Sequence, residues 1–261
     1  MTQPHLASEL DDRGVLTLTL NRPDKRNALS AELVEALLAT FERLPSAEDV
    51  HVVVLTGAGD QAFCAGADLD PAALAQGPYA LHRSRERYAA LLQAMARAGR
   101  PVVARVQGVV AGGGMGLLMG ADLAVAAADV RLMLPELKVG LFPMMVTALL
   151  QRHVGRKKAL ELLLTAATLS AAEAEGLGLL NRAVPRDELD EHVEHFVTTF
   201  LSFSRAVLQL GRDAYYRSED MAFGDALTYL CSQLTVNGLT EDAATGLGAF
   251  LTRSTPSWKH R

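Results

Sequence analysis

Apolar residues in the first half of the chain follow the patterns of buried strands. Apolar and polar residues alternate over 15–20, which is typical of a strand with one buried face. The stretch 51–56 contains the uninterrupted run Val-Val-Val-Leu and predicts a strand covered on both faces. Further buried strands are predicted over 102–106 and 123–126. These strands indicate a sheet in the first half of the chain.

Helical patterns separate these strands and then replace them. Helices are expected over four stretches: 30–44, 79–98, 115–120 and 156–165. Ser30 is a suitable N-cap for the first of them. Beyond Pro143 we expect helices alone, one of them opened by the capping box Ser-Ala-Ala-Glu at 170–173. The sequence therefore predicts an α/β protein with strand–strand–helix units in its first two thirds and helices in its last third.

Composition and charge are those of a globular protein. The 261 residues are 49% hydrophobic and 21% charged, with a net charge of −5. The basic residues are scattered, so we expect no nucleic-acid surface. Only residues 253–261 are locally basic, and this end is either a solvated tail or a segment that binds phosphate.

Cysteines and apolar stretches favour a cytoplasmic location. Cys64 and Cys231 fit none of the usual metal spacings, which indicates a reduced compartment without a disulfide framework. Residues 1–14 lack the apolar run of a signal peptide. The longest uncharged stretch, 106–121, is shorter than the roughly 20 apolar residues of a membrane span, so no membrane partner is expected.

Two glycine-containing turns each follow a buried strand. The first covers 63–69, and the second covers 108–116 and includes three successive glycines at 112–114. Glycines leave backbone N–H groups unshielded, which suits the binding of a developing oxyanion at short range. Taken singly, each turn is better explained by tight packing of a helix on a sheet.

Other patterns in the chain favour structural roles. Residues 57–62 fit the G-x-G-x-x-A form of a dinucleotide fingerprint, but the residues after them do not open an amphipathic helix. His192 and His195 are typical of a solvated helix face rather than a metal site, because no third ligand is placed beside them. Asp122 is expected to pair with a neighbouring strand or loop.

Six segments together carry a resemblance to a known family: 21–29, 63–69, 106–114, 134–141, 164–180 and 240–259. Their sequences and order resemble the crotonase superfamily, which contains the enoyl-CoA hydratases and isomerases. The resemblance covers nearly the whole chain. Residues 134–141, Leu-Pro-Glu-Leu-Lys-Val-Gly-Leu, are similar to the family's P-E-x-x-x-G-L segment, whose glutamate projects over the substrate's α, β and γ carbons.

The resemblance implies roles for residues of this chain. Glu136 is the expected acid/base group, and the N–H groups of Ala67 and Gly113 are the expected pair that holds the thioester oxygen. Contacts with the acyl-CoA substrate are implied for Lys25, Arg26, Ala28, Ala65, Asp68, Leu69, Gly112 and Pro135. Arg253 and Lys259 fall where the family often contacts CoA phosphate, although a solvated tail explains them equally well. No metal and no separate cofactor are implied, because coenzyme A is part of the substrate.

The resemblance also implies an architecture. Residues 1–195 are expected to form a spiral of strand–strand–helix units. Residues 196–261 are expected to form a helical region for trimerisation and pocket closure. Family members are usually homotrimers or dimers of trimers, and the CoA pocket can borrow residues from a neighbouring chain.

One position departs from the two-glutamate hydratases of this family. Their first glutamate comes two residues after the glycine triplet, where this chain has Gly116, so only Glu136 remains. Hydration divides its work conveniently between two carboxylates, whereas moving a double bond needs one base and an oxyanion hole. One carboxylate can still hydrate special substrates, above all one that has its own carboxylate.

Two further expectations concern the walls of the site. Asp68 follows the donor residue Ala67, and a brace of the oxyanion loop is favoured over a second acid. Residues 142–146, Phe-Pro-Met-Met-Val, replace the family's usual glycine-rich turn and make the far end of the pocket bulkier and more apolar. A medium or branched acyl group is therefore expected, with Phe142, Met144 and Met145 in the core or the pocket wall.

Three functions remain open at this point. The leading hypothesis is an enoyl-CoA isomerase or hydratase that uses Glu136 as its acid/base group. A second is decarboxylation or hydrolysis of an acyl thioester in the same oxyanion hole. A third is an acyl-CoA-binding protein without catalysis, which the missing glutamate supports to some extent.

Overall fold

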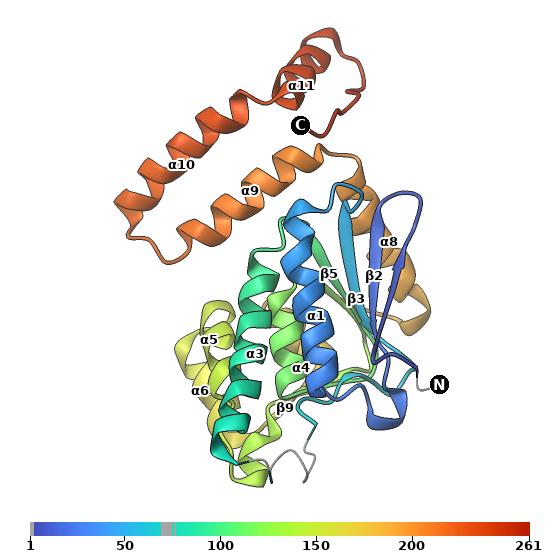
Figure 1. The fold of residues 1–261 in the computed structure, drawn as a ribbon, viewed down its shortest axis with the longest axis vertical. Coiled ribbons are helices and arrows are strands. Elements are labelled where there is room, and N and C mark those ends of the chain that lie inside the picture. Colours follow the sequence, from blue (N-terminus) through green and yellow to red (C-terminus); the bar gives the residue numbers. More distant parts are fainter. Residues whose placement is uncertain (1–2, 69–74, 76) are drawn as a thin grey trace.

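The computed structural model describes residues 3–68, 75 and 77–261. Leu69, one of the residues expected to contact the substrate, lies outside the described residues. The described chain forms two sheets, a set of helices around them and a C-terminal arm (Figure 1).

The larger sheet has the strand order β1-β2-β3-β5-β7-β10. Its strands are β1 (Leu6–Leu10), β2 (Val15–Leu20), β3 (Val52–Gly57), β5 (Val102–Val106), β7 (Leu123–Ala127) and β10 (Arg182–Val184). Only β1 is antiparallel to its neighbour, and the other pairs are parallel. Every residue of β3 is buried, as the uninterrupted Val-Val-Val-Leu run predicts for a strand covered on both faces.

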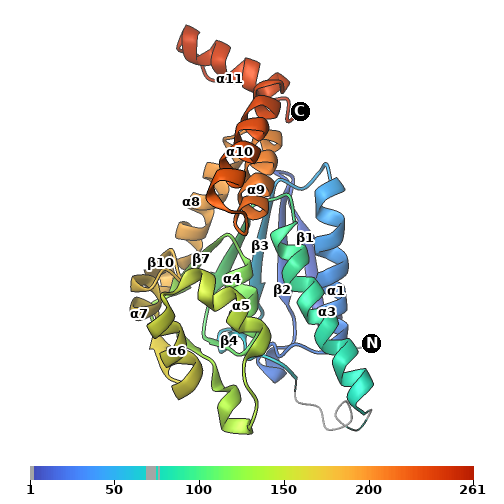
Figure 2. The same ribbon diagram turned by 90° about the vertical axis from the view of Figure 1, so that its left-hand side faces the viewer.

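Helices cover both faces of this sheet. The helices α1 (Ala31–Arg43) and α3 (Pro78–Ala96) lie on one face, and α8 (Leu189–Leu201) lies on the other (Figure 2). The Ser30 side chain accepts a hydrogen bond from the Leu33 N–H, so Ser30 is the N-cap expected from the sequence. Leu33, Leu37 and Phe41 form the buried stripe of α1.

A smaller sheet with the order β4-β6-β8-β9 lies beyond the carboxyl ends of the main strands. Its strands are β4 (Ala62–Cys64), β6 (Val109–Ala111), β8 (Arg131–Met133) and β9 (Thr168–Ser170). The chain passes from a main strand to a short strand and then to a helix, as in β3–β4–α3 and in β5–β6–α4, where α4 is Gly113–Gly120. The predicted strand–strand–helix spiral is therefore confirmed.

The later part of the core holds the helices α5 (Met144–His153), α6 (Arg156–Thr165) and α7 (Ala171–Gly176). The predicted capping box at Ser170 and Glu173 is present at the start of α7. The expectation of helices alone beyond Pro143 is wrong, because β9 and β10 also lie there. Each has only three residues and is fixed by pairing with β8 or β7, which no local periodicity reveals.

Three helices form a C-terminal arm that extends away from the sheets (Figure 1). They are α9 (Arg205–Ser218), α10 (Phe223–Gly238) and α11 (Glu241–Thr252). The boundary expected after residue 195 falls inside α8, which packs on the sheet. Asp122 anchors the arm: its carboxylate accepts hydrogen bonds from the Val102 N–H (2.7 Å), from Arg212 (2.8 Å) and from the Tyr216 hydroxyl (2.7 Å).

Candidate active site

The two glycine-containing turns meet at the end of the smaller sheet. The strands that lead into them, β4 and β6, are parallel neighbours, so both turns leave the same edge. Gly66 has φ +93°, and a Cβ there would lie 2.9 Å from the Ala111 carbonyl oxygen and 3.4 Å from the Gly113 nitrogen. Glycine is therefore required at 66 by both the backbone conformation and the close approach of the second turn.

The two N–H groups singled out from the sequence are not used within the described chain. Among residues 3–68, 75 and 77–261, neither the Ala67 N–H nor the Gly113 N–H donates a hydrogen bond, although the adjacent Asp68 N–H donates to the Leu29 carbonyl (3.1 Å). Gly113 begins α4, where the first N–H groups of a helix lack partners within the helix. Ala67 is exposed and Gly113 is half-buried.

Glu136 lies beside the second turn. It belongs to the short 3-10 helix η3 (Pro135–Val139), which ends at Gly140 in the left-handed conformation. A Cβ added at Gly112 would lie 3.0 Å from Glu136 Oε1. Glu136 Oε2 is the one buried side-chain nitrogen or oxygen without a hydrogen-bond partner among the residues that the structure describes. Burial raises the pKa of Glu136 above the ordinary glutamate value.

Tyr88 occupies the space beside Gly116. A Cβ at Gly116 would lie 2.0 Å from the Tyr88 hydroxyl oxygen. The hydroxyl donates a 2.6 Å hydrogen bond to the Gly113 carbonyl, and the side chain is buried. Sequence reasoning missed this residue, and its only local signal is an aromatic residue on the apolar stripe of α3.

Residues 21–29, the first of the segments that resemble the family, are bonded to the first glycine-containing turn, 63–69. Asn27 is fully buried at φ 57°, and its side chain donates to the carbonyls of Ala58 (3.0 Å) and Ala62 (2.8 Å). Arg22 pairs with Asp68 at 2.7 Å, an arrangement that agrees with the expected brace role of Asp68. Neither Asn27 nor Arg22 was singled out from the sequence, although asparagine tolerates the left-handed conformation better than most residues.

Comparison with known proteins decides the family. The family model described as Enoyl-CoA hydratase/isomerase matches residues 11–261. The chain belongs to the enoyl-CoA hydratase/isomerase family. It is 32% identical over 262 residues to the "Probable enoyl-CoA hydratase echA8" of Mycobacterium tuberculosis, with 100% of each chain covered. It is 33% identical over 248 residues to the "2,3-dehydroadipyl-CoA hydratase" of Escherichia coli, with 95% of this chain and 96% of the relative covered.

Solved structures agree with this assignment. The crystal structure of an enoyl-CoA hydratase from Mycobacterium smegmatis matches with a TM-score of 0.93 and 36% identity, and the match covers 98% of this chain and 99% of the other. The crotonase-like fold expected from the sequence is confirmed, and the protein is an enzyme of the hydratase/isomerase family.

The remaining expected substrate contacts of this family member fall into two groups. Lys25, Arg26, Ala28, Ala65, Asp68, Gly112 and Pro135 lie on the segments that surround the two turns and Glu136. Lys25 and Arg26 are exposed, and the Arg26 carbonyl accepts a hydrogen bond from the Ala65 N–H (3.0 Å). The other group, Arg253 and Lys259, follows α11 at the opposite end of the molecule from the smaller sheet (Figure 1). Lys259 there pairs with Glu241 at 3.1 Å. A single chain therefore does not bring these two basic residues to Glu136.

Phe142, Met144 and Met145, expected in the core or the pocket wall, differ in how deeply the single chain buries them. Phe142 and Met145 are partly buried against the core, but Met144 is 71% exposed. Met144 is the first residue of α5, and the first turn of a helix directs some side chains to solvent whatever their polarity. Met144 is therefore not a core residue of the single chain, and its expected place in the pocket wall stays a prediction.

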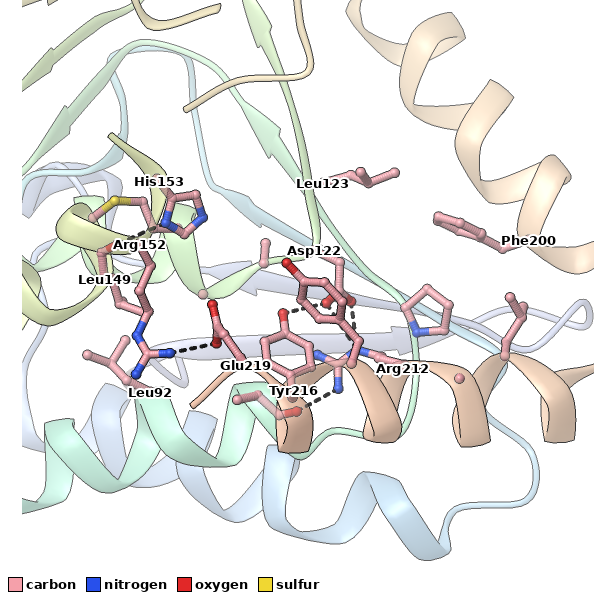
Figure 3. Close-up of a pocket in the computed structure, with 18 of the residues that line it drawn as sticks. Leu92, Asp122, Leu123, Leu149, Arg152, His153, Phe200, Arg212, Tyr216 and Glu219 are labelled. Atoms are coloured by element: carbon pink, nitrogen blue, oxygen red, sulfur yellow. Dashed lines mark hydrogen bonds and ion pairs between the residues drawn. The ribbon is translucent and has the colours of Figure 1, made fainter. Parts of the chain in front are cut away.

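A cavity of about 520 Å³ lies elsewhere in this enzyme, between α3, α4, α5 and α9 (Figure 3). Its charged groups already pair with one another: Arg212 with Asp122 at 2.8 Å, and Arg152 with Glu219 at 2.7 Å. None of the expected site residues lines this cavity. It is therefore separate from the candidate active site.

Within the described ranges, 3–68, 75 and 77–261, no three or more histidine, cysteine, aspartate or glutamate side chains are grouped so as to hold a metal ion. In the same part of the chain, no helix is both long and apolar enough to cross a membrane.

Proposed function

We propose that this enzyme isomerises or hydrates an enoyl-CoA through an enolate, with Glu136 as its acid/base group. The observation that carries the proposal is the position of Glu136: its Oε1 lies against Gly112, next to the place where Gly66 approaches the Gly113 nitrogen. A carboxylate, buried on one oxygen and without a partner there, thus lies beside two turns in which the Ala67 and Gly113 N–H groups donate no hydrogen bond within the described chain.

In the proposed reaction the Ala67 and Gly113 N–H groups hold the thioester oxygen. The Glu136 carboxylate removes a proton from the α carbon of a 3-enoyl-CoA, and the electron pair moves onto that oxygen to give a dienolate. The same carboxyl group then returns the proton to the γ carbon, which leaves a 2-enoyl-CoA and regenerates the carboxylate. No further reactant is needed.

Known magnitudes make this arrangement sufficient for substantial catalysis. Removing one oxyanion donor from an enzyme typically costs about 3 kcal/mol in transition-state stabilisation. A positioned general base contributes roughly 10²–10⁴-fold. Burial of Glu136 raises its pKa toward neutrality, which makes the carboxylate a stronger base at physiological pH.

Isomerisation is the better supported of the two reactions. Position 116, where the two-glutamate hydratases of this family have a carboxylate, is glycine, and Tyr88 fills the adjoining space. A second group for activating water is therefore missing from that place. Partly buried Phe142 and Met145 support an apolar end to the acyl pocket and so a medium or branched acyl group.

CoA binding and assembly form the second part of the proposal. Exposed Lys25 and Arg26 are suited to the CoA phosphates, and Arg253 and Lys259 would reach a neighbouring chain's substrate in a trimer or a dimer of trimers. Assembly is supported by large exposed apolar side chains on the arm, such as Phe223, Leu234 and Phe250, at 81%, 74% and 80% exposure. A cytoplasmic location, as expected from the sequence, completes the proposal.

The Glu136→Gln variant tests the function. We expect it to bind a CoA ester as the wild type does and to lose roughly 10²–10⁴-fold in turnover, because glutamine cannot accept the proton. Turnover is measured on a panel of four substrates: crotonyl-, 3-enoyl-, branched 2-enoyl- and 2,3-dehydroadipyl-CoA. Each reaction is followed by ultraviolet absorbance and by mass. Glu42→Gln, on the exposed side of α1, is the matched control and should remain active.

The outcomes separate the alternatives. Full activity of Glu136→Gln on every substrate that the wild type converts contradicts the assigned role. Release of carbon dioxide or free CoA by the wild type would instead identify a decarboxylase or a thioester hydrolase. Binding of the whole panel without conversion would identify an acyl-CoA-binding protein.

A further inference from the structure

The hydroxyl of Tyr88 and a side chain at position 116 cannot both take these places unless one of them moves. A Cβ at Gly116 would lie 2.0 Å from the hydroxyl oxygen and 3.2 Å from Cζ of the same ring. Contacts under 3.0 Å require one group to move, and Tyr88 is held on a buried face of α3 with Leu91 and Met95. Gly116 is therefore the partner of Tyr88 and not merely a position that has lost a carboxylate.

Tyr88 also holds the start of α4. Its hydroxyl donates to the carbonyl of Gly113, the residue whose N–H is proposed to bind the thioester oxygen. A Cβ at Gly113 would lie 3.5 Å from the same hydroxyl oxygen, so the tyrosine packs closely on this turn. Burial raises the pKa of Tyr88, which keeps the hydroxyl protonated and able to donate. The α3 and α4 helices pack directly on each other, so the contact does not depend on a loop.

We propose that Tyr88 is a positioning residue of the active site. Its hydroxyl fills the volume that a carboxylate at 116 would need and fixes the turn that presents the Gly113 N–H to the thioester oxygen. The inference rests on the proposed oxyanion role of Gly113. Its consequence is a site arranged for proton transfer by one carboxylate, with a tyrosine in place of a second carboxylate.

The Tyr88→Phe variant tests this role, because it removes the hydroxyl and keeps the ring. We expect kcat to fall about tenfold, the effect of losing one well-formed hydrogen bond, with KM changed less than about twofold. Tyr79→Phe is the matched control, since Tyr79 lies on the same helix and is 75% exposed. It should behave as the wild type.

A spectroscopic measurement separates positioning from a purely structural role. Donors to the thioester oxygen shift the absorbance of a bound 2,4-dienoyl-CoA to longer wavelength, because they stabilise negative charge on that oxygen. Tyr88→Phe should reduce this shift, and Tyr79→Phe should not. A lower melting temperature of Tyr88→Phe with wild-type kcat and wild-type spectral shift would overturn the proposal.

A double-mutant cycle tests the mutual exclusion of the two groups. Gly116→Ala should strongly reduce activity in the wild type and much less in Tyr88→Phe, where the nearest ring atom would be Cζ at 3.2 Å. Equal losses in both backgrounds would contradict the geometry. The spectral measurement needs binding but no turnover, so it tests Tyr88 even if the wild type converts no enoyl-CoA and the proposed function fails.

Discussion

Replacement of Gly114 by alanine tests how closely the two donor turns are packed. Gly114 lies in the first turn of α4, and a Cβ there would lie 2.4 Å from the Cys64 carbonyl oxygen and 2.8 Å from the Cys64 Cβ. Cys64 ends β4 and leads directly into the turn with Gly66 and Ala67. The added methyl group therefore pushes one donor turn away from the other.

The size of the effect follows from these distances. Ordinary contact begins near 3.4 Å, so the turn after Cys64 and the start of α4 must separate by about 1 Å. Overpacking of this kind costs about 1–3 kcal/mol of stability, which leaves a domain of ordinary stability folded. A misplacement of about 1 Å in a catalytic arrangement can cost roughly 10²-fold in rate. We therefore expect Gly114→Ala to fold and to lose about 100-fold in kcat.

The assay compares kcat, KM and the melting temperature of Gly114→Ala with those of the wild type on the preferred enoyl-CoA. Gly176→Ala is the matched control, because a Cβ at Gly176 would meet nothing within 4 Å among the described residues. The control should keep the wild-type kcat. If Gly114→Ala also kept the wild-type kcat, the two turns would not form one rigid site as described.

Two more predictions concern ionisation and the arm. Because burial raises the pKa of Glu136, kcat/KM should fall on the acid side at a higher pH than an ordinary glutamate would cause. The raised pKa also means that Glu136 contributes stability at low pH that is lost as the pH rises through its folded-state pKa. Glu136→Gln should therefore gain stability relative to the wild type as the pH rises above the ordinary pKa of a glutamate, and a relative loss in urea unfolding would contradict this. Asp122→Ala should lower the free energy of unfolding in urea by about 3–5 kcal/mol, because it leaves the buried Arg212 guanidinium without its counter-charge. Asp129→Ala breaks an exposed pair and should lower it by less than about 1 kcal/mol. Equal losses in the two variants would contradict the role of Asp122 in holding the arm.

Much of the fold could be predicted because the main elements carry strong local patterns. The fully apolar run of β3 and the capped amphipathic helix α1 are both where the sequence places them. β1 was missed because Leu6–Leu10 carries polar Ser8 and Glu9 and pairs only with β2 at the edge of the sheet. Half-exposed edge strands lack the apolar run that identifies a buried strand.

The residues of the candidate site also fall into those that the sequence identifies and those that only the structure reveals. Glu136, Ala67 and Gly113 stand in segments whose local sequence resembles the family, and the structure places those segments together. Tyr88 and the pair of Arg22 with Asp68 depend on contacts between residues far apart in the chain. Neither motif spacing nor hydrophobic periodicity records such contacts, so only the folded structure reveals them.

Arg253 and Lys259 show a second limit on what can be predicted from the sequence. Their segment matches the family, yet one chain places them at the far end of the molecule from Glu136 (Figure 1). If Arg253 and Lys259 contact CoA near a Glu136 side chain, that CoA would have to be bound by a neighbouring chain. Sequence alone gives the residue type and its place in the chain, whereas the geometry of an assembly also depends on how the exposed apolar faces of the arm pack.

A crystal structure of the Glu136→Gln variant with a bound 3-enoyl-CoA tests the central claim most directly. We predict that the Ala67 and Gly113 nitrogens both lie about 2.7–3.1 Å from the thioester oxygen, with the side chain at 136 facing the α and γ carbons. A thioester oxygen bound elsewhere, with the two amides aimed at different groups, would contradict the proposed mechanism.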